Sequence, residues 1–312
     1  MPTNLLNLDQ ARVANPILTD VARGYQNAPL IADKLFPRVP VKSRAGQVIQ
    51  FGKDAFRIRN TKRGPGEPVA RINVNYGSTG FKLEQHALGV TVPVEHTEEA
   101  RVMADMELLD ESIMTTVSDV RLEIENEAAV LATTAGNYAA GNKVALTSTD
   151  RWDTTTGDPF AQVAAGREAV RQKIGRRPNV MIIGAKVLTM AQCNGKILDR
   201  LKYTSSAVPT LADLARLFQV DEVVEGGAVA AGDDDVFTDI WGNNIILAYV
   251  ALGSKTRREP SYGYNYELKG SPIVTSPEFN KQNRSFEAEY IYEHGLYLVG
   301  AEGGYLMQTV VS

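Results

Sequence analysis

Three histidines are the side chains of this sequence best suited to proton transfer near neutral pH: His86, His96 and His294. All three are isolated, and one of them would act as a general base only if the fold assembled partners for it. The sequence contains no Gly-x-Ser-x-Gly, Gly-x-x-x-x-Gly-Lys, Gly-x-Gly-x-x-Gly or His-Glu-x-x-His motif. We therefore expect structural or exposed histidines and no catalytic site.

An aspartate run and a single cysteine are the other residues with chemical potential. Asp233, Asp234 and Asp235 could bind a hard cation, but they lack the alternating ligand spacing of a calcium loop, so an exposed acidic turn is favoured. Cys193 is the only cysteine, which excludes an internal disulfide and fits a reducing compartment. We expect it to be a small buried hydrophobe, since Lys196 nearby is only a weak hint of reactivity. The sequence thus predicts no cofactor and no metal site.

Composition describes an ordinary folded protein. The chain has 312 residues, of which 44% are hydrophobic and 22% charged, enough to bury a substantial core. The 33 basic and 37 acidic residues give a net charge of -4, so the chain as a whole lacks the charge of a nucleic-acid binder, and any DNA contact is local. No signal peptide and no long apolar run is present, and we expect neither export by a signal peptide nor membrane insertion.

The first 37 residues mix short apolar clusters with polar residues and predict an extended arm with one short helix near Leu30. Such a segment cannot bury its own apolar side chains. Leu35 and Phe36 therefore need a surface, which either the rest of the chain or a neighbouring molecule supplies.

Residues 38–95 alternate apolar and polar side chains with a period of two, interrupted by a Gly/Pro turn at 61–68. This pattern predicts a long antiparallel ribbon, which is marginally stable unless it lies on something else. Between Arg38 and Arg71 there are nine basic and two acidic residues, a local net charge of +7.

The next segment has the opposite charge. Residues 95–127 hold eleven acids and two bases, a net charge of -9. Apolar residues recur there every three or four positions without Gly or Pro between Thr97 and Ala135, which predicts a helix roughly 50 Å long at ~1.5 Å per residue, with Thr97 as its N-cap. Its acids form either a solvated face or an interaction surface. The adjacent cationic ribbon favours interaction, with the same chain or with the next one.

The remainder predicts a connector at 136–158, an α/β lobe, and extended chain near the C-terminus. A Pro-initiated helix over 159–174 ends at a Gly/Pro turn, and a buried strand follows at 180–183. The other expected elements of this part are helices near 187–201 and 209–218, strands at 222–225 and 245–250, and alternating chain at 286–299.

The order of these parts resembles the Hong Kong 97-like fold of tailed-bacteriophage capsid proteins. Residues 25–41, in which a short helix and Phe36-Pro37 lead into the ribbon, look like the passage from arm to loop in that family. Residues 210–224 are similar to the helix and strand of its axial lobe. The resemblance spans nearly the whole chain, but it depends on segment order more than on an invariant motif.

The resemblance implies an α+β fold in five segments. These are an N-terminal arm (1–37), an extended β-ribbon loop (38–95), a spine helix with the peripheral domain (96–158), an α/β axial domain (159–270) and C-terminal strands that return to the peripheral domain (271–312).

The implied function is that of a major capsid protein rather than an enzyme: a virion subunit, assembled in the host bacterial cytoplasm, that forms hexamers and pentamers of an icosahedral head around double-stranded DNA. Its implied partners are copies of itself, a portal, a decoration protein, packaged DNA on the inner face and a separate scaffolding protein, since no long helical region precedes the arm.

The ribbon would lie across the spine helix of an adjacent subunit. The expected interface residues are Arg57, Arg59, Lys62 and Arg63 on the ribbon, Glu107, Asp110, Glu111 and Glu123 on the spine, and Leu35 and Phe36 on the arm.

Two alternatives stay open. An encapsulin-type compartment has the same architecture and encloses cargo protein instead of DNA. An enzyme with its site in the α/β lobe belongs to a different class, and the missing catalytic motifs argue against it.

Overall fold

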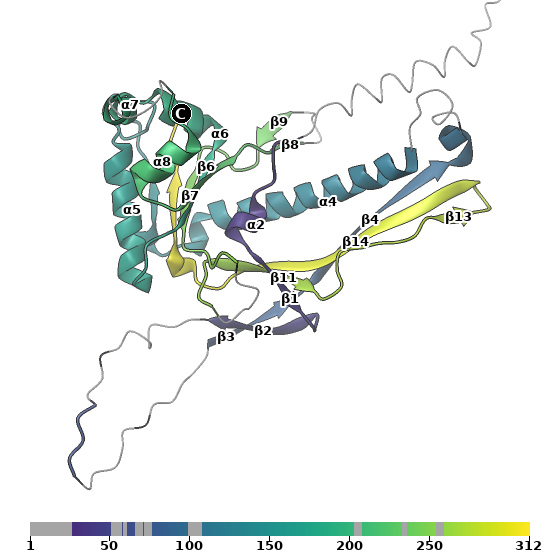
Figure 1. Ribbon diagram of the computed structural model, residues 1–312, viewed down its shortest axis with the longest axis horizontal. Coiled ribbons are helices and arrows are strands. Elements are labelled where there is room, and N and C mark those ends of the chain that lie inside the picture. The colour runs from purple at the N-terminus through teal and green to yellow at the C-terminus, as the bar shows by residue number, and fades with distance from the viewer. Residues whose placement is uncertain are drawn as a thin grey trace, which may run out of the picture.

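The computed structural model of the chain describes residues 27–50, 58, 61–65, 71, 77–98, 108–202, 208–232, 236–253 and 259–312. They form an elongated body in which a long helix lies along a long sheet, with a lobe of sheet and helices at one end (Figure 1). The fold therefore mixes helices and sheets, in agreement with the predicted class. Within these ranges no helix is both long and apolar enough to cross a lipid bilayer.

One strand, β14 (Ser285–Leu298), organises the long sheet. It pairs antiparallel with β4 (Glu84–Pro93) over all ten residues of β4. The alternation of the sequence is visible in β14, because Ala288, Tyr290 and Tyr292 are buried. The opposite edge of β14 carries shorter strands: β13 (Glu278–Asn280), β12 (Ile273–Val274) and β11 (Gly263–Leu268), the last of which pairs in parallel with β1 (Arg38–Val41).

The long helix, α4 (Leu108–Thr133), packs on the face of this sheet formed by β4 and β14. Val120 and Ile124 contact Tyr290 and Tyr292 of β14 in one apolar cluster. Three fully buried alanines continue the contact toward the C-terminal end of the helix: Ala128, Ala129 and Ala132. Their small side chains allow the arm and the lobe to approach the helix backbone closely.

The two ends of the predicted spine helix differ from expectation. Residues 94–98 are already helical, so Thr97 lies inside the helical segment. Its hydroxyl donates to the Pro93 carbonyl at 3.2 Å, a bond made by threonines within helices, so the predicted N-cap at Thr97 is wrong. At the other end α4 stops at Thr133, where the Asn137 side chain donates to the Leu131 carbonyl.

The lobe contains a five-stranded sheet in the order β5-β15-β10-β6-β7. Its strand β6 (Val180–Gly184) is buried on both faces, because Met181 and Ile183 face the helices of the lobe while Val180 and Ile182 face α4 and the arm. This double burial explains why β6 reads as an uninterrupted apolar run. The other strands of the lobe are β5 (Lys143–Ala145), β7 (Glu222–Gly226), β10 (Ile245–Ala248) and β15 (Gly304–Gln308), with a separate pair β8 (Val229–Ala231) and β9 (Phe237–Asp239).

Two helices of the lobe form where the sequence predicts them. α5 (Pro159–Ile174) begins at Asp158, whose side chain accepts two backbone N–H groups of the first turn, and ends at Gly175 in the left-handed region with φ 70°. α8 (Leu211–Phe218) begins with a capping box at Thr210. Local residue types were sufficient here because both caps are made within a few residues of the chain.

The helix expected near 187–201 is instead two helices, α6 (Ala185–Cys193) and α7 (Gly195–Leu201). They are separated at Asn194, whose side-chain oxygen caps α7. Cys193, the last residue of α6, is exposed, so the expectation of a buried cysteine is wrong.

Strand pairing also changes the expected extent of the ribbon. In the range 38–95, β2 (Ala45–Gln50) and β3 (Gly77–Lys82) pair antiparallel with each other, as predicted for a ribbon. The strand β4 of the same range belongs to the long sheet, because it pairs with β14 rather than with β2 or β3. The residues between β2 and β3 lie mostly outside the described residues.

The expected boundary at residue 270 does not separate the two sheets. β11 lies in the range 159–270 yet joins the long sheet, and β15 lies in the range 271–312 yet joins the sheet of the lobe. The chain therefore crosses between the lobe and the long sheet more than once. Local patterns predict strands, but they do not say with which strand each one pairs.

Candidate assembly interface

The base of the cationic ribbon is held firmly against the long sheet. Phe81 of β3 stacks on Tyr266 of β11 with ring centroids 4.9 Å apart. The Tyr297 hydroxyl donates to the Lys82 carbonyl at 2.8 Å. The Arg44 guanidinium donates to both carboxylate oxygens of Glu293 at 2.6 and 2.7 Å. These contacts fix the direction in which β2 and β3 leave the body.

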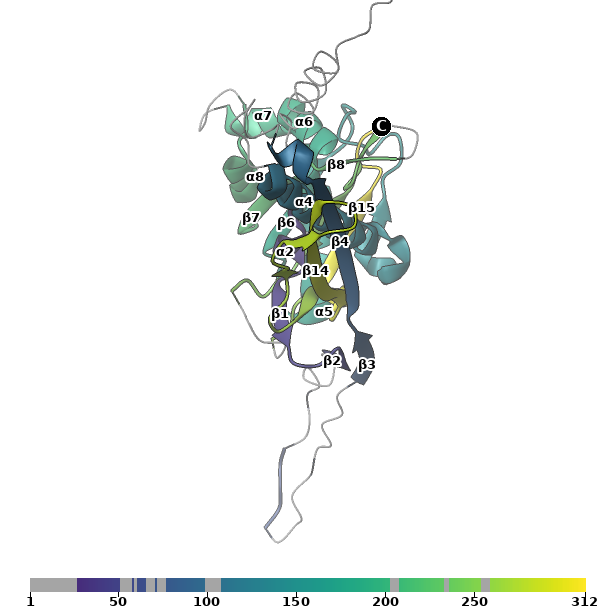
Figure 2. The same cartoon turned by 90° about the vertical axis from the view of Figure 1, so that its right-hand side faces the viewer.

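That direction leads away from the acidic helix of the same chain. In two perpendicular views, β2 and β3 project from the body in the direction away from α4, and residues 61–65 lie beyond them (Figures 1 and 2). Lys62 and Arg63, two of the predicted interface cations, are exposed in this outlying segment. The other two, Arg57 and Arg59, lie outside the described residues.

The acids predicted to receive these cations have different environments. Asp110 in the first turn of α4 is exposed and Glu111 beside it is half-buried, whereas Glu107 lies outside the described residues. Glu123 is directed at its own chain, because its Oε2 lies 3.4 Å from Nδ1 of His86 on β4. The acidic run is therefore not one uniform surface.

One acid of this run, Glu125, is entirely internal, and its role was not predicted. Its carboxylate is fully buried and accepts hydrogen bonds from the backbone N–H groups of Ile31 and Ala32 and from the Trp241 indole N–H. Burial raises the pKa of Glu125, and the three N–H donors act in the opposite direction. The residue joins the spine, the arm and the lobe. The helical periodicity of the sequence identifies position 125 only as polar and does not predict that its carboxylate is buried.

Leu35 and Phe36, expected at a contact between subunits, are both 0% exposed within the single chain. Leu35 closes the short helix α2 (Ala32–Leu35), and the Phe36 ring lies 5.7 Å from that of Tyr262. A Cβ on Gly263 would lie 2.5 Å from the Phe36 ring, so glycine leaves the space that this ring fills. The expectation of an intersubunit role is therefore wrong, because the chain's own helix and sheet cover both side chains.

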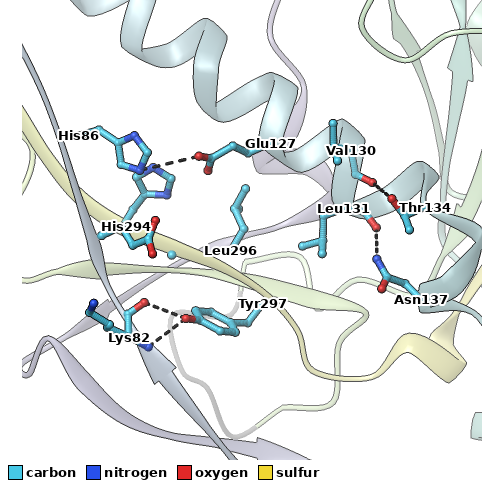
Figure 3. A pocket seen from close by; sticks show the side chains of 12 residues that line it. Lys82, His86, Glu127, Val130, Leu131, Thr134, Asn137, His294, Leu296 and Tyr297 are labelled. Atoms are coloured by element: carbon cyan, nitrogen blue, oxygen red, sulfur yellow. Dashed lines mark hydrogen bonds and ion pairs between the residues drawn. The ribbon is translucent and has the colours of Figure 1, made fainter.

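Two of the three histidines meet in a pocket of about 420 Å³ between α4 and the long sheet (Figure 3). The rings of His86 and His294 have centroids 4.5 Å apart, and Glu127 of α4 faces them. His86 and His294 are far apart along the chain, so the sequence predicts two isolated histidines. Their meeting is produced by the pairing of β4 with β14. His96 is exposed and lies outside this pocket, and Asp233, Asp234 and Asp235 lie outside the described residues.

Comparison with known proteins places this architecture among phage shell proteins. No protein-family model matches the chain. The major capsid protein of Burkholderia phage BcepMu is 34% identical over 308 residues, covering 97% of this chain and 98% of that protein. The crystal structure of a phage-related protein from Bordetella bronchiseptica is 34% identical, with a TM-score of 0.77 over 95% of this chain and 96% of that one.

An encapsulin, the shell protein of a compartment that encloses cargo protein, is less similar to this chain in sequence. The encapsulin of Synechococcus elongatus has a TM-score of 0.54 over 94% of this chain and 95% of its own, but only 11% identity, which shows a shared fold alone. A putative prophage capsid protein of Escherichia coli has the same TM-score. Identity of about one third along nearly the whole length of both chains is the stronger finding: the chain belongs to the phage major capsid proteins of the Hong Kong 97-like fold.

Proposed function

We propose that the chain assembles into hexamers and pentamers that close an icosahedral head around double-stranded phage DNA. As a major capsid protein it is a structural component of the virion, and its relatives are structural proteins rather than enzymes. The proposal extends to assembly in the host cytoplasm, to non-specific contact between the inner face and DNA, and to a scaffolding protein, a portal and a decoration protein as partners. No catalytic role is assigned to the lobe.

The assembly contact that we propose joins the cationic ribbon of one subunit to the acidic spine of the next. Its residues are Arg57, Arg59, Lys62 and Arg63 on one side and Glu107, Asp110 and Glu111 on the other. Glu123 is left out of this set, because its carboxylate faces His86 of its own chain.

A single observation supports the contact most directly. Contacts at the base of the ribbon, made by Arg44 just before β2 and by Lys82 of β3, hold it so that β2 and β3 project from the body away from the length of α4 (Figure 1). This direction supports pairing of the ribbon with the spine of a second subunit rather than with its own.

The energetics require many such contacts. An exposed ion pair contributes about 0–1 kcal/mol, and salt screens it. In a closed shell each subunit contacts several neighbours at once, so contacts too weak to hold an isolated dimer become persistent. We expect assembly to be sensitive to the sum of the charges on the ribbon and insensitive to the loss of one.

The experiment is reversal of the four ribbon cations together, Arg57→Glu, Arg59→Glu, Lys62→Glu and Arg63→Glu. We expect a folded subunit with unchanged circular dichroism that forms no shells by electron microscopy and light scattering. A matched control exchanges the same four positions conservatively, Arg57→Lys, Arg59→Lys, Lys62→Arg and Arg63→Lys, which keeps every charge and should assemble. Normal particles from the reversed variant would refute the proposed contact.

A further inference from the structure

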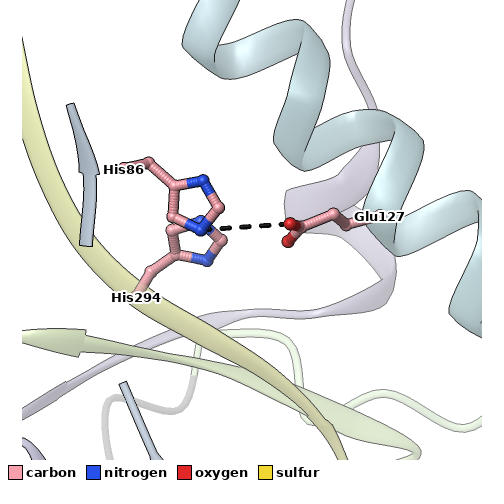
Figure 4. A group of neighbouring side chains, drawn as sticks. All are labelled: His86, Glu127 and His294. Atoms are coloured by element: carbon pink, nitrogen blue, oxygen red, sulfur yellow. Dashed lines mark ion pairs between the residues drawn. The ribbon is translucent and has the colours of Figure 1, made fainter. Parts of the chain in front are cut away.

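Three side chains from three elements converge beneath α4. His86 comes from β4, His294 from β14 and Glu127 from the helix (Figure 4). In the β4–β14 register His86 is opposite Tyr292, two residues before His294, so both histidines project from the same face of the sheet. One nitrogen of each histidine and one carboxylate oxygen of Glu127 all lie within 4.8 Å of one another.

His294 is the member of this cluster whose polar atoms are unsatisfied. The residue is 1% exposed within the single chain, and neither ring nitrogen has a hydrogen-bond partner among the described residues. Buried polar atoms are nearly always satisfied, so two unsatisfied nitrogens on one ring require an explanation. Burial lowers the pKa of His294 to about 4, with the nearby His86 and Arg38 acting in the same direction. One nitrogen of the ring faces His86 and Glu127, so the ring presents to the cluster a polar atom that no described residue satisfies.

His86 is oriented as metal-binding histidines are. Its Nδ1 lies 3.4 Å from Oε2 of Glu123, and its Nε2 lies 3.9 Å from Oε1 of Glu127. A carboxylate beside one ring nitrogen fixes the proton on that nitrogen and leaves the lone pair of the other for a ligand. Glu123 lies beside Nδ1, and Nε2 faces Glu127 and the interior of the cluster.

The surrounding charge favours a cation. The carboxylates of Glu123 and Glu127 lie 3.4 and 3.9 Å from the two ring nitrogens of His86. Glu84 and Glu127 line the same pocket, where Lys82 is the only cationic side chain among the lining residues. A bound cation would relieve the repulsion among these carboxylates.

We propose that His86, Glu127 and His294 bind a divalent transition-metal ion of the zinc type. Two imidazole nitrogens and one carboxylate oxygen are a donor set that suits Zn²⁺, whereas Ca²⁺ and Mg²⁺ prefer oxygen ligands throughout. Zinc–ligand bonds of about 2.0–2.2 Å require these atoms to draw closer together than they lie in the structure, so the binding of the ion would have to move the side chains. The fourth position faces the pocket and takes a water molecule. The ion would tie α4 to β4 and β14.

The test uses the full chain without a histidine tag, dialysed against a chelator and titrated with Zn²⁺ by calorimetry and with Co²⁺ by visible absorption. We expect one ion per chain, Co²⁺ bands typical of four-coordinate nitrogen and oxygen ligation, and a higher melting temperature with metal. Metal binding by the unassembled subunit is measured independently of shell formation, so failure of one proposal is distinguishable from failure of the other.

Conservative variants locate the site. Glu127→Gln and His86→Gln should each weaken Zn²⁺ binding by at least roughly 100-fold, and Glu123→Gln by about 10–100-fold. His96→Gln is the matched control, because His96 is exposed and outside the cluster, and it should bind as the parent chain does. Circular dichroism verifies folding of each variant. Absence of stoichiometric binding by the parent chain, or binding unchanged in both Glu127→Gln and His86→Gln, would overturn the proposal and leave the two histidines as an aromatic pair.

Discussion

The Trp241 indole N–H donates a hydrogen bond of 2.7 Å to the carboxylate of Glu125, in the interior of the protein. The same carboxylate receives the backbone N–H groups of Ile31 and Ala32 at the start of α2. One side chain of the spine thereby fixes both the arm and the segment of the lobe that precedes β10. The position of α2, and with it the burial of Phe36, depends on this group.

Removal of this carboxylate should be costly. In Glu125→Ala three N–H donors lose their acceptor inside the protein, and we expect the free energy of unfolding to fall by about 3–5 kcal/mol. Asn126→Ala is the control, because Asn126 is the exposed neighbour, and its effect should stay within about 0.5 kcal/mol. Urea denaturation of the unassembled subunit measures both. Equal effects of the two substitutions would contradict the role assigned to Glu125.

Phe36 should act on subunit stability rather than on contacts between subunits. Phe36→Ala empties a site that is 0% exposed, which costs about 3–5 kcal/mol. Leu30→Ala, at a residue 37% exposed, should cost much less. The melting temperature of the unassembled subunit is the measurement. A Phe36→Ala subunit as stable as its parent would show that the ring is not part of the core.

A compensating exchange should restore assembly to the reversed ribbon. Every subunit carries both segments, so adding Glu107→Lys, Asp110→Lys and Glu111→Lys to the four ribbon reversals recreates opposite charges at each proposed contact. We expect particles to return in electron micrographs, whereas the three spine reversals alone should prevent assembly. Failure of the combined variant, with its fold intact, would argue that the charges act through something other than direct pairing.

Acid should weaken the start of α5. The N–H of Ala161 holds the pKa of Asp158 below its usual 3.8, partial burial opposes this, and Lys196 and the N–H of Phe160 lower it further. The pKa of Asp158 is lower in the folded protein than in the unfolded chain. Its stabilising effect is therefore fully present above the pKa of the unfolded chain, and it is lost as the pH falls through the pKa of the folded protein. Asp158→Ala should cost about 1 kcal/mol near pH 7. We measure the urea midpoints of the variant and of the parent chain between pH 6 and pH 3. The difference between the two midpoints should shrink below the pKa that Asp158 has in the unfolded chain. A difference independent of pH would exclude a role for the charge.

The sequence by itself determined the elements whose causes are local. The bounds of α5 and α8 follow from caps at Asp158, Gly175 and Thr210, and the buried strand β6 follows from its apolar run. Local composition also separated a cationic segment from an acidic helix. The predictions at Thr97 and at Asn194 were wrong, because the Thr97 hydroxyl bonds the Pro93 carbonyl within a helical segment and the Asn194 side chain caps a new helix. Threonine and asparagine side chains can make either kind of hydrogen bond, and the sequence does not show which one forms.

The tertiary structure alone decided which segments meet. It paired β4 with β14 instead of with the ribbon, brought His86 beside His294, and enclosed Glu125 and Phe36 within one chain. The physical reason is that periodicity records which face of an element is buried, whereas strand register and the depth of burial depend on contacts between residues far apart in the chain. A charged residue in a helical pattern therefore looks the same whether it faces water or three buried N–H groups.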